Sequence, residues 1–193
     1  MTGLWLLLRA RRLVPIGCFV IAIEALVLLY GSFEFRVGQQ TVQPVPIAVF
    51  APVLISCALA ALYFSPQPGV DRSAARDLRP IMLTLLLGCF VLAAAGLAFA
   101  THDLTGDLTT RGACRDLAGF FGLALIGTAF LGAAWFWTLP VLAAMVPMIG
   151  LHDGGLVGLL TWPLGSDQSS SAAVIAVTLL IAGFCGLAMT RTR

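Results

Sequence analysis

Long apolar runs separated by short polar segments make up almost the whole chain. Crossing a hydrocarbon core of roughly 30 Å takes about 20 apolar residues, and six runs of that kind can be placed along the sequence. The segments between them carry Pro, Gly and polar residues, which end helices. We therefore predict an all-α, polytopic membrane protein with a single transmembrane domain over residues 1–193. The predicted spans cover residues 14–33, 45–64, 80–100, 115–134, 137–160 and 172–190.

Composition and charge support this prediction and add an orientation. Of the 193 residues 60% are hydrophobic and 10% are charged, whereas soluble domains are about 25% charged. All 11 basic residues are arginines, and six spans place eight of them on the side of the two termini and three on the other side. Since positive segments stay on the cytoplasmic side, we expect a multi-pass plasma-membrane protein with both termini in the cytoplasm. The eight are Arg9, Arg11, Arg12, Arg72, Arg76, Arg79, Arg191 and Arg193, and the three are Arg36, Arg111 and Arg115.

The first 13 residues, MTGLWLLLRARRL, are apolar and then basic. This pattern is typical of a helix that lies in the membrane interface, with Trp5 and the leucines at the acyl boundary and the arginines among the headgroups. We predict an interfacial helix over residues 1–13. The alternative is a positive flank that only sets the topology.

The longest polar stretch, residues 65–79, follows the second predicted span. Asp71 is a suitable N-cap for a short helix over 72–78, and Pro80 biases Arg79 out of helical conformation. At 100° per residue, Arg72, Arg76 and Arg79 fall within a sector of about 60°, with Leu78 on the far side. The basic face can therefore bind an external anion, which is either anionic lipid or a carboxylate-bearing cytoplasmic partner. A loop that only sets the topology is the third possibility.

Glu24 lies at the midpoint of the first predicted span. A carboxylate at membrane depth costs on the order of 3 kcal/mol, so it is protonated, paired or turned to a polar interior. Glu24 is therefore a candidate intramembrane site. The alternative is a neutral glutamic acid that joins two helices by a hydrogen bond.

A second polar interruption, His152-Asp153-Gly154-Gly155, falls inside the fifth predicted span. The two glycines favour a helix break, and the apolar segment 156–164 is too short to cross a membrane. We predict a re-entrant segment on the outer side, with one long tilted helix as the alternative. The fourth span carries a stripe of small residues, including Gly119, Gly122, Gly127 and Gly132, which favours close helix packing or dimerisation.

Several functional classes lack their sequence signatures. The chain has no nucleotide-binding G-x-x-x-x-G-K-[ST] loop, no H-E-x-x-H and no G-x-S-x-G. Its five cysteines form no metal pattern and no disulfide framework. We therefore expect no enzyme activity, no metal or cofactor in this chain, and no nucleic-acid partner.

The whole arrangement resembles the membrane subunits of ABC-2 type exporters. The features that carry the resemblance are the basic interfacial N-terminus, six spans with cytoplasmic ends, an amphipathic helix between spans two and three, a minimal joint between four and five, and a broken outer segment before the sixth. The string RDLAGFFGLALIG, with WFWTLP after it, is similar to predicted permeases from actinobacteria.

This resemblance implies a role for the polar loop. In that family the corresponding helix is a coupling helix that sits in a cleft of a separate ATPase subunit. Residues 71–79 would then form it, with Arg72 and Arg76 facing the ATPase and Leu78 packing at the contact. ATP and Mg²⁺ would be bound by the partner, and a second membrane subunit would complete a homodimer or a heterodimer.

We therefore expect the permease subunit of an ATP-driven exporter that moves an amphipathic or hydrophobic substrate outward. Two alternatives remain open at this point. One is a proton- or ion-coupled transporter that uses Glu24. The other is a membrane scaffold or immunity-type subunit that does not transport and only binds partners through the arginine face.

Overall fold

The computed structural model describes residues 12–31, 34–35, 45–46, 50–64, 79–102, 109–146, 162 and 169–189. The helices in this part of the chain are α2 (Leu13–Tyr30), α3 (Ala51–Ala61), α5 (Arg79–Ala100), α6 (Thr110–Phe130), α7 (Thr138–Met145) and α9 (Ser170–Met189). Two short strands, β1 (Glu34–Phe35) and β2 (Val45–Pro46), pair in antiparallel orientation.

Four of these helices, α2, α5, α6 and α9, are long and apolar enough to cross a membrane. Each of them falls on a run that the sequence predicts as a span. The largest difference between a predicted and an observed boundary is at the start of α6, which begins at Thr110 instead of residue 115. The prediction of a helical membrane protein is therefore confirmed.

The second predicted span, residues 45–64, is divided in the structure. Val45–Pro46 form strand β2, and helix α3 begins only at Ala51 and has 11 residues. Pro52 lies in the first turn of α3, where its missing N–H costs no helical hydrogen bond. The apolar run does not reveal this division, because Pro46 interrupts the helix without interrupting the hydrophobic run. Of the fifth predicted span, 137–160, the structure describes α7 and Val146, and the rest lies outside the described residues.

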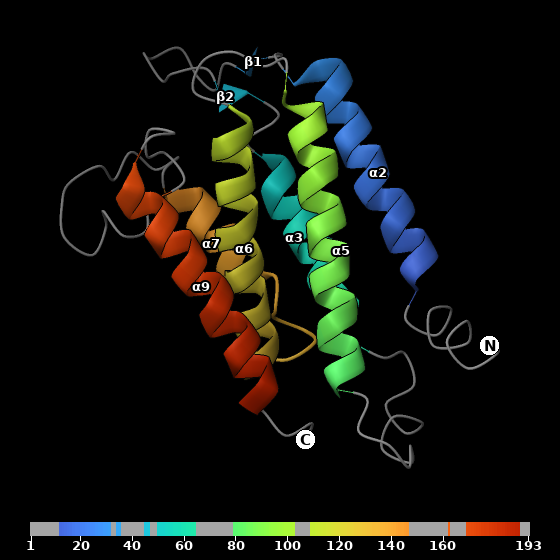
Figure 1. Cartoon of the computed structure of the whole chain (residues 1–193), viewed down its shortest axis with the longest axis vertical. Helices are drawn as coiled ribbons and strands as arrows, with labels where there is room; N and C mark the ends of the chain where they lie inside the picture. The colour runs from blue at the N-terminus through green and yellow to red at the C-terminus, as the bar shows by residue number, and fades with distance from the viewer. Residues whose placement is uncertain are drawn as a thin grey trace.

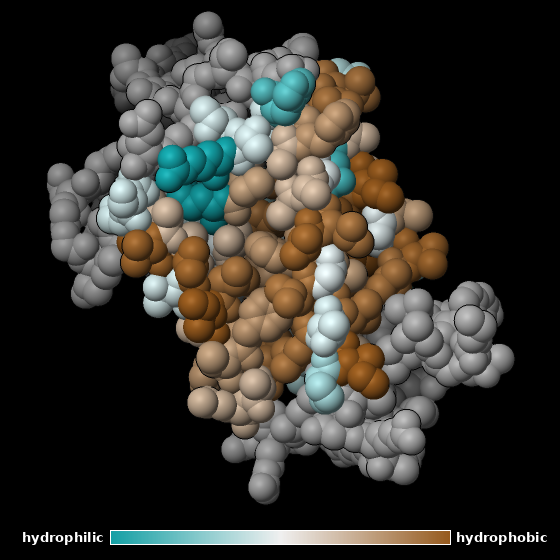
Figure 2. Space-filling view, viewed as in Figure 1, coloured by the Kyte–Doolittle hydropathy of each residue, from teal (hydrophilic) through white to brown (hydrophobic). Residues whose placement is uncertain are grey.

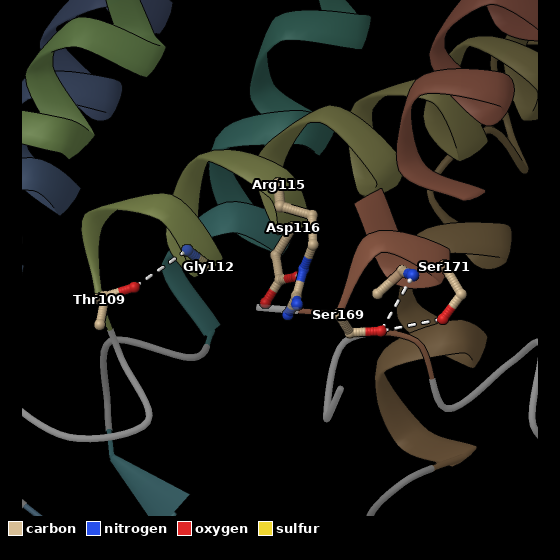
Figure 3. Close-up of polar contacts among 7 residues, drawn as sticks. Thr109, Gly112, Arg115, Asp116, Ser169 and Ser171 are labelled. Carbon is tan, nitrogen blue, oxygen red and sulfur yellow. Dashed lines mark hydrogen bonds and ion pairs between the residues drawn. The ribbon is translucent and has the colours of Figure 1, made fainter. Parts of the chain in front are cut away.

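The early start of α6 is explained by its N-cap. The Thr109 side chain accepts a hydrogen bond from the backbone N–H of Gly112 at 3.4 Å (Figure 3), which satisfies one of the free N–H groups of the first turn. Arg111 and Arg115, which the sequence placed in an outer segment, are therefore on the helix. The apolar run alone gave a boundary that was five residues too late.

The long helices run in two directions. In Figure 1, α2 and α5 ascend, whereas α6 and α9 descend. The Thr101 hydroxyl is 3.5 Å from the Thr110 hydroxyl, and the Phe90 ring stacks on Phe121 at 5.2 Å, as expected for antiparallel α5 and α6. We call the end of the bundle where α2 and α5 begin and α6 and α9 finish the terminal end, and the opposite end the distal end. The terminal end is marked by Leu13, Arg79, Phe130 and Met189, and the distal end by Tyr30, Ala100, Thr110 and Ser170.

Helix α6 occupies the interior of the bundle. It packs against α3, α5, α7 and α9. In its membrane-length segment 61% of the residues are buried, against 11% in α2. Four large side chains of α6 are at most 2% exposed, namely Leu117, Phe120, Phe121 and Leu125. The protein therefore surrounds α6, while α2, α5 and α9 form the outer wall.

The glycines of α6 allow its neighbours to approach closely. A Cβ on Gly122 would lie 2.5 Å from the backbone oxygen of Leu179 on α9, and a Cβ on Gly127 would lie 2.5 Å from the backbone oxygen of Phe136. A Cβ on Gly119 would overlap the ring of Trp162. Of the two roles expected for this stripe, the structure shows packing within the chain.

The outer wall is apolar. Figure 2 shows hydrophobic side chains across the middle of the bundle, and large exposed side chains include Leu92 on α5 at 74% and Val174 on α9 at 65%. Water-soluble monomers rarely expose continuous apolar surface of this kind. The chemistry of the surface agrees with the lengths of the helices and indicates that this wall faces lipid or another membrane subunit.

Candidate functional site

Two of the candidate site residues predicted from the sequence are among the described residues, Glu24 and Arg79. The other members of the predicted coupling segment, Asp71, Arg72, Arg76 and Leu78, lie outside them. So do the four residues of the predicted outer break, His152, Asp153, Gly154 and Gly155. The predicted interfacial helix over residues 1–13 also lies outside them except for Arg12 and Leu13.

Two of these segments end in a residue that the structure describes, the coupling segment at Arg79 and the N-terminal segment next to Arg12. Arg79 is the first residue of α5, with Pro80 in the second position of the helix. The expectation that Pro80 keeps Arg79 out of the helix is wrong, because proline is well tolerated in a first turn and the helix can include the residue before it. Arg12, which precedes α2, has φ 56° and ψ 31°. This left-handed conformation makes Arg12 the N-cap of α2, so the helix begins at Leu13.

Glu24 lies closer to the distal end of the bundle than the sequence indicated. The predicted span 14–33 placed it at the midpoint, but α2 ends at Tyr30, six residues after Glu24. At 1.5 Å per residue the carboxyl-bearing position is about 9 Å from the end of the helix. The midpoint of α2 itself falls two to three residues before Glu24, because the helix ends at Tyr30 with Gly31 as its C-cap.

The carboxyl group of Glu24 is packed against α5 at Gly96. A Cβ on Gly96 would lie 2.5 Å from the Glu24 Cδ atom and 2.6 Å from Oε1. The absence of a side chain at this position therefore makes room for the carboxyl group. Within the described part of the chain Oε1 is buried and has no hydrogen-bond partner. Buried polar atoms in proteins almost always have a partner, so this oxygen requires an explanation.

A cavity of about 210 Å³ adjoins Glu24 between α2, α3 and α5. Its walls come from Leu13 to Glu24 on α2, from Leu59 and Leu62 at the end of α3, and from the middle of α5 around Cys89. The described residues that line it are otherwise Leu, Ile, Val, Ala and Gly. Glu24 is therefore the one lining residue that carries a formal charge when ionised, and Cys89 is the other lining residue with a titratable group.

These contacts limit what the site can do chemically. A proton relay needs a further titratable group within reach of the carboxyl group, and the lining offers only a thiol. Within the described residues no three His, Cys, Asp or Glu side chains gather in a way that could hold a metal ion. The site therefore provides one carboxyl group, that of Glu24, at the distal end of an apolar cavity. This group accepts hydrogen bonds and is negatively charged when ionised.

The sequence did not predict a polar cluster that the structure shows at the distal end of the bundle. Arg115 Nε donates to Asp116 Oδ1 at 2.9 Å, and the two side chains are only 7% and 14% exposed. In Figure 3 this pair lies on α6 near the start of α9, where Ser169 Oγ accepts from the backbone N–H of Ala172 at 3.3 Å. The sequence places the RD dipeptide at the start of the fourth predicted span, but it does not show that the two side chains pair or that they lie near α9. The pair neutralises one of the three arginines assigned to the outer side.

The fold and the site together define a class. The chain is a helical membrane protein in which the ionisable side chain of Glu24 lies on a membrane-length helix, beside an apolar cavity. The sequence matches no protein-family model, and no solved structure matches the fold.

Proposed function

We propose that the chain is the membrane-spanning subunit of an ATP-driven exporter, crosses the plasma membrane six times, and couples to a separate ATPase through the segment 71–79. The observation that carries this proposal is the direction of the long helices.

Helix directions support six crossings. Helices α2 and α5 run the same way, so the chain must cross the membrane an odd number of times between them. Helix α3 provides that crossing, although its 11 residues need help from the flanking apolar residues to cover the hydrocarbon core. Helices α6 and α9 also run the same way, and α7 begins the return between them. The directions of the four long helices therefore support two additional crossings, one between α2 and α5 and one between α6 and α9.

The same directions gather most of the arginines at one end. Segments 1–12, 65–78 and 190–193 all adjoin helix ends at the terminal end of the bundle. With Arg79 they contain eight of the 11 arginines, while Arg111 and Arg115 lie on α6 near the distal end. The positive-inside rule then makes the terminal end cytoplasmic.

A cytoplasmic basic loop in a chain without a nucleotide site fits a subunit that works with a separate ATPase. The loop joins α3 to α5, two helices that both line the cavity at Glu24. A movement of the loop by a partner would therefore be transmitted to the wall of that cavity through rigid helices. The resemblance to ABC-2 type exporters supplies the partner, an ATPase that binds ATP and Mg²⁺, and a second membrane subunit. Anionic lipid at the same arginines is the competing interpretation.

The test is ATPase stimulation in a reconstituted complex. The protein is purified with a candidate ATPase subunit, and hydrolysis is measured with Arg72→Glu plus Arg76→Glu. The matched control is Arg191→Glu plus Arg193→Glu, which makes the same charge change in another segment at the terminal end. We expect stimulation and complex formation to be lost in the first variant and kept in the control. Equal activity of both variants would exclude the coupling role, and equal loss would indicate binding through general charge.

The orphaned Oε1 atom favours a second candidate function, a proton- or ion-coupled transporter that uses Glu24. This candidate predicts flux across proteoliposomes without any ATPase, abolished by Glu24→Gln. Flux that requires the ATPase and survives Glu24→Gln would eliminate it.

A further inference from the structure

The cavity beside Glu24 combines a hydrogen-bond acceptor with an elongated apolar volume. From Leu13 to Glu24 the α2 wall of the cavity rises about 16 Å. The volume of about 210 Å³ along that wall is elongated, as a hydrocarbon chain is.

The two ends of the cavity differ in chemistry. At its distal end the buried Oε1 of Glu24 has no hydrogen-bond partner among the described residues. Toward the terminal end the walls are aliphatic, with Leu13, Leu59 and Leu62. No residue that lines the cavity in the described part of the chain carries a positive charge. The carboxyl group of Glu24 is thus the one side-chain oxygen group that the lining offers to a ligand.

We propose that this cavity binds a single-chain primary alkylamine, with the ammonium group on Glu24 and the hydrocarbon chain along α2 toward Leu13. An ammonium group brings three hydrogen-bond donors and the charge that complements a carboxylate. The aliphatic lining favours a hydrocarbon chain over water, because apolar cavities of about 150 Å³ exclude water and bind small apolar ligands. The ammonium group thus matches the carboxyl end of the cavity, and the hydrocarbon chain matches its aliphatic end.

The orientation also suits a molecule that enters from the lipid. Glu24 is about 9 Å from the distal end of α2, and the apolar cavity continues from it toward the middle of the membrane. An amphiphile in the distal leaflet has this orientation, with its head near that surface and its tail inward. An aminophospholipid fits less well, because its phosphate would bring an anion close to the carboxyl group.

The experiment uses the purified full chain in phosphatidylcholine nanodiscs and a dodecylamine probe with a photoreactive diazirine at the tail end. After irradiation, the label in α2, α3 and α5 peptides is measured by mass spectrometry. We expect unlabelled dodecylamine to displace the probe at least about tenfold more effectively than dodecanol, which cannot make a charge-assisted bond. Phosphatidylethanolamine in the nanodisc is expected not to compete.

Three variants separate the site from the bilayer. Glu24→Gln keeps the shape and removes the charge, and should reduce labelling at least about tenfold. Gly17→Leu should do the same, because Gly17 lines the cavity and a Cβ there meets no atom within 4 Å, so the new side chain grows into the open volume. Gly88→Leu is the matched control. A Cβ on Gly88 also meets no atom within 4 Å, but Gly88 is outside the cavity lining.

Two results would overturn the proposal. Labelling that is unchanged by Gly17→Leu would show that the probe reacts from the bilayer. Labelling that is lost in Gly17→Leu but kept in Glu24→Gln would show a site for the chain without recognition of the amine. The assay contains no ATPase and no transport step, so its outcome is independent of the proposed exporter function.

Discussion

The contact between α6 and α9 at Gly122 allows a stability prediction with a worked magnitude. In Gly122→Ala the new Cβ would lie 2.5 Å from the Leu179 backbone oxygen and 2.5 Å from the Leu180 backbone nitrogen. Carbon atoms normally approach other heavy atoms to about 3.5 Å, so the two helices would have to separate by roughly 1 Å. Backbone atoms cannot rotate away as a flexible side chain could.

The expected cost follows from two opposing terms. Forcing a methyl group into a packed interface lowers stability by about 1–3 kcal/mol. Replacing glycine by alanine inside a helix raises it by up to about 1 kcal/mol. We expect Gly122→Ala to lower the free energy of unfolding by about 1–2 kcal/mol. The physical reason is that packing between membrane helices depends on close backbone approach, since lipid supplies no hydrophobic drive for their association.

The measurement is unfolding by sodium dodecyl sulfate in mixed micelles, followed by tryptophan fluorescence. Gly186→Ala is the control, because it makes the same change on the facing helix, where a Cβ would lie 3.5 Å from the Ala129 Cβ in ordinary contact. The control should be as stable as the unchanged protein or up to about 1 kcal/mol more stable. If Gly122→Ala and Gly186→Ala have the same unfolding midpoint, the argument from close packing is refuted.

Three further changes test other parts of the fold. Trp162→Ala removes a ring that is 3% exposed, and should lower the free energy of unfolding by about 3 kcal/mol in the same assay; a loss below 1 kcal/mol would contradict its place in the core. Ser56→Ala removes a buried hydrogen bond that the Ser56 hydroxyl donates to the Leu117 carbonyl oxygen at 3.4 Å. Because this bond is long, the free energy of unfolding should fall by no more than about 1 kcal/mol. A larger loss would contradict the weak contribution expected of this bond. Gly96→Ala should leave stability within about 1 kcal/mol, because the new Cβ meets only the flexible end of Glu24, but should reduce labelling by the amine probe; labelling equal to that of the unchanged protein would show that the carboxyl position does not matter.

The helices that face lipid could be predicted from the sequence, and the helix in the interior only in part. For α2, α5 and α9 the apolar run and the observed helix nearly coincide, because a helix surrounded by lipid must be apolar over its whole length. Helix α6 is surrounded by protein and accommodates Arg111 in its first turn, four residues before the predicted start at residue 115. A search for apolar runs therefore started it too late.

The candidate site shows the same limit. The sequence identified Glu24 because an ionisable residue in an apolar run is expensive. It could not identify Gly96 as the residue that makes room for the carboxyl group, since 72 positions separate the two along the chain and glycine carries no chemical signal. The cavity itself depends on how α2, α3 and α5 meet, which no local pattern encodes.

The use of the α6 glycines inside the chain constrains how two membrane subunits could pair. Gly119, Gly122 and Gly127 are covered by Trp162, Leu179 and Phe136 of the same chain, so a second copy cannot approach them. The described apolar surface that remains open belongs largely to α2, α5 and α9. If subunits pair with a substrate path between them, as the proposed function requires, that path is lined from this outer wall. The cavity at Glu24 lies within the part of the wall formed by α2 and α5, so pairing through these two helices would enclose it and pairing through α9 would leave it open to lipid.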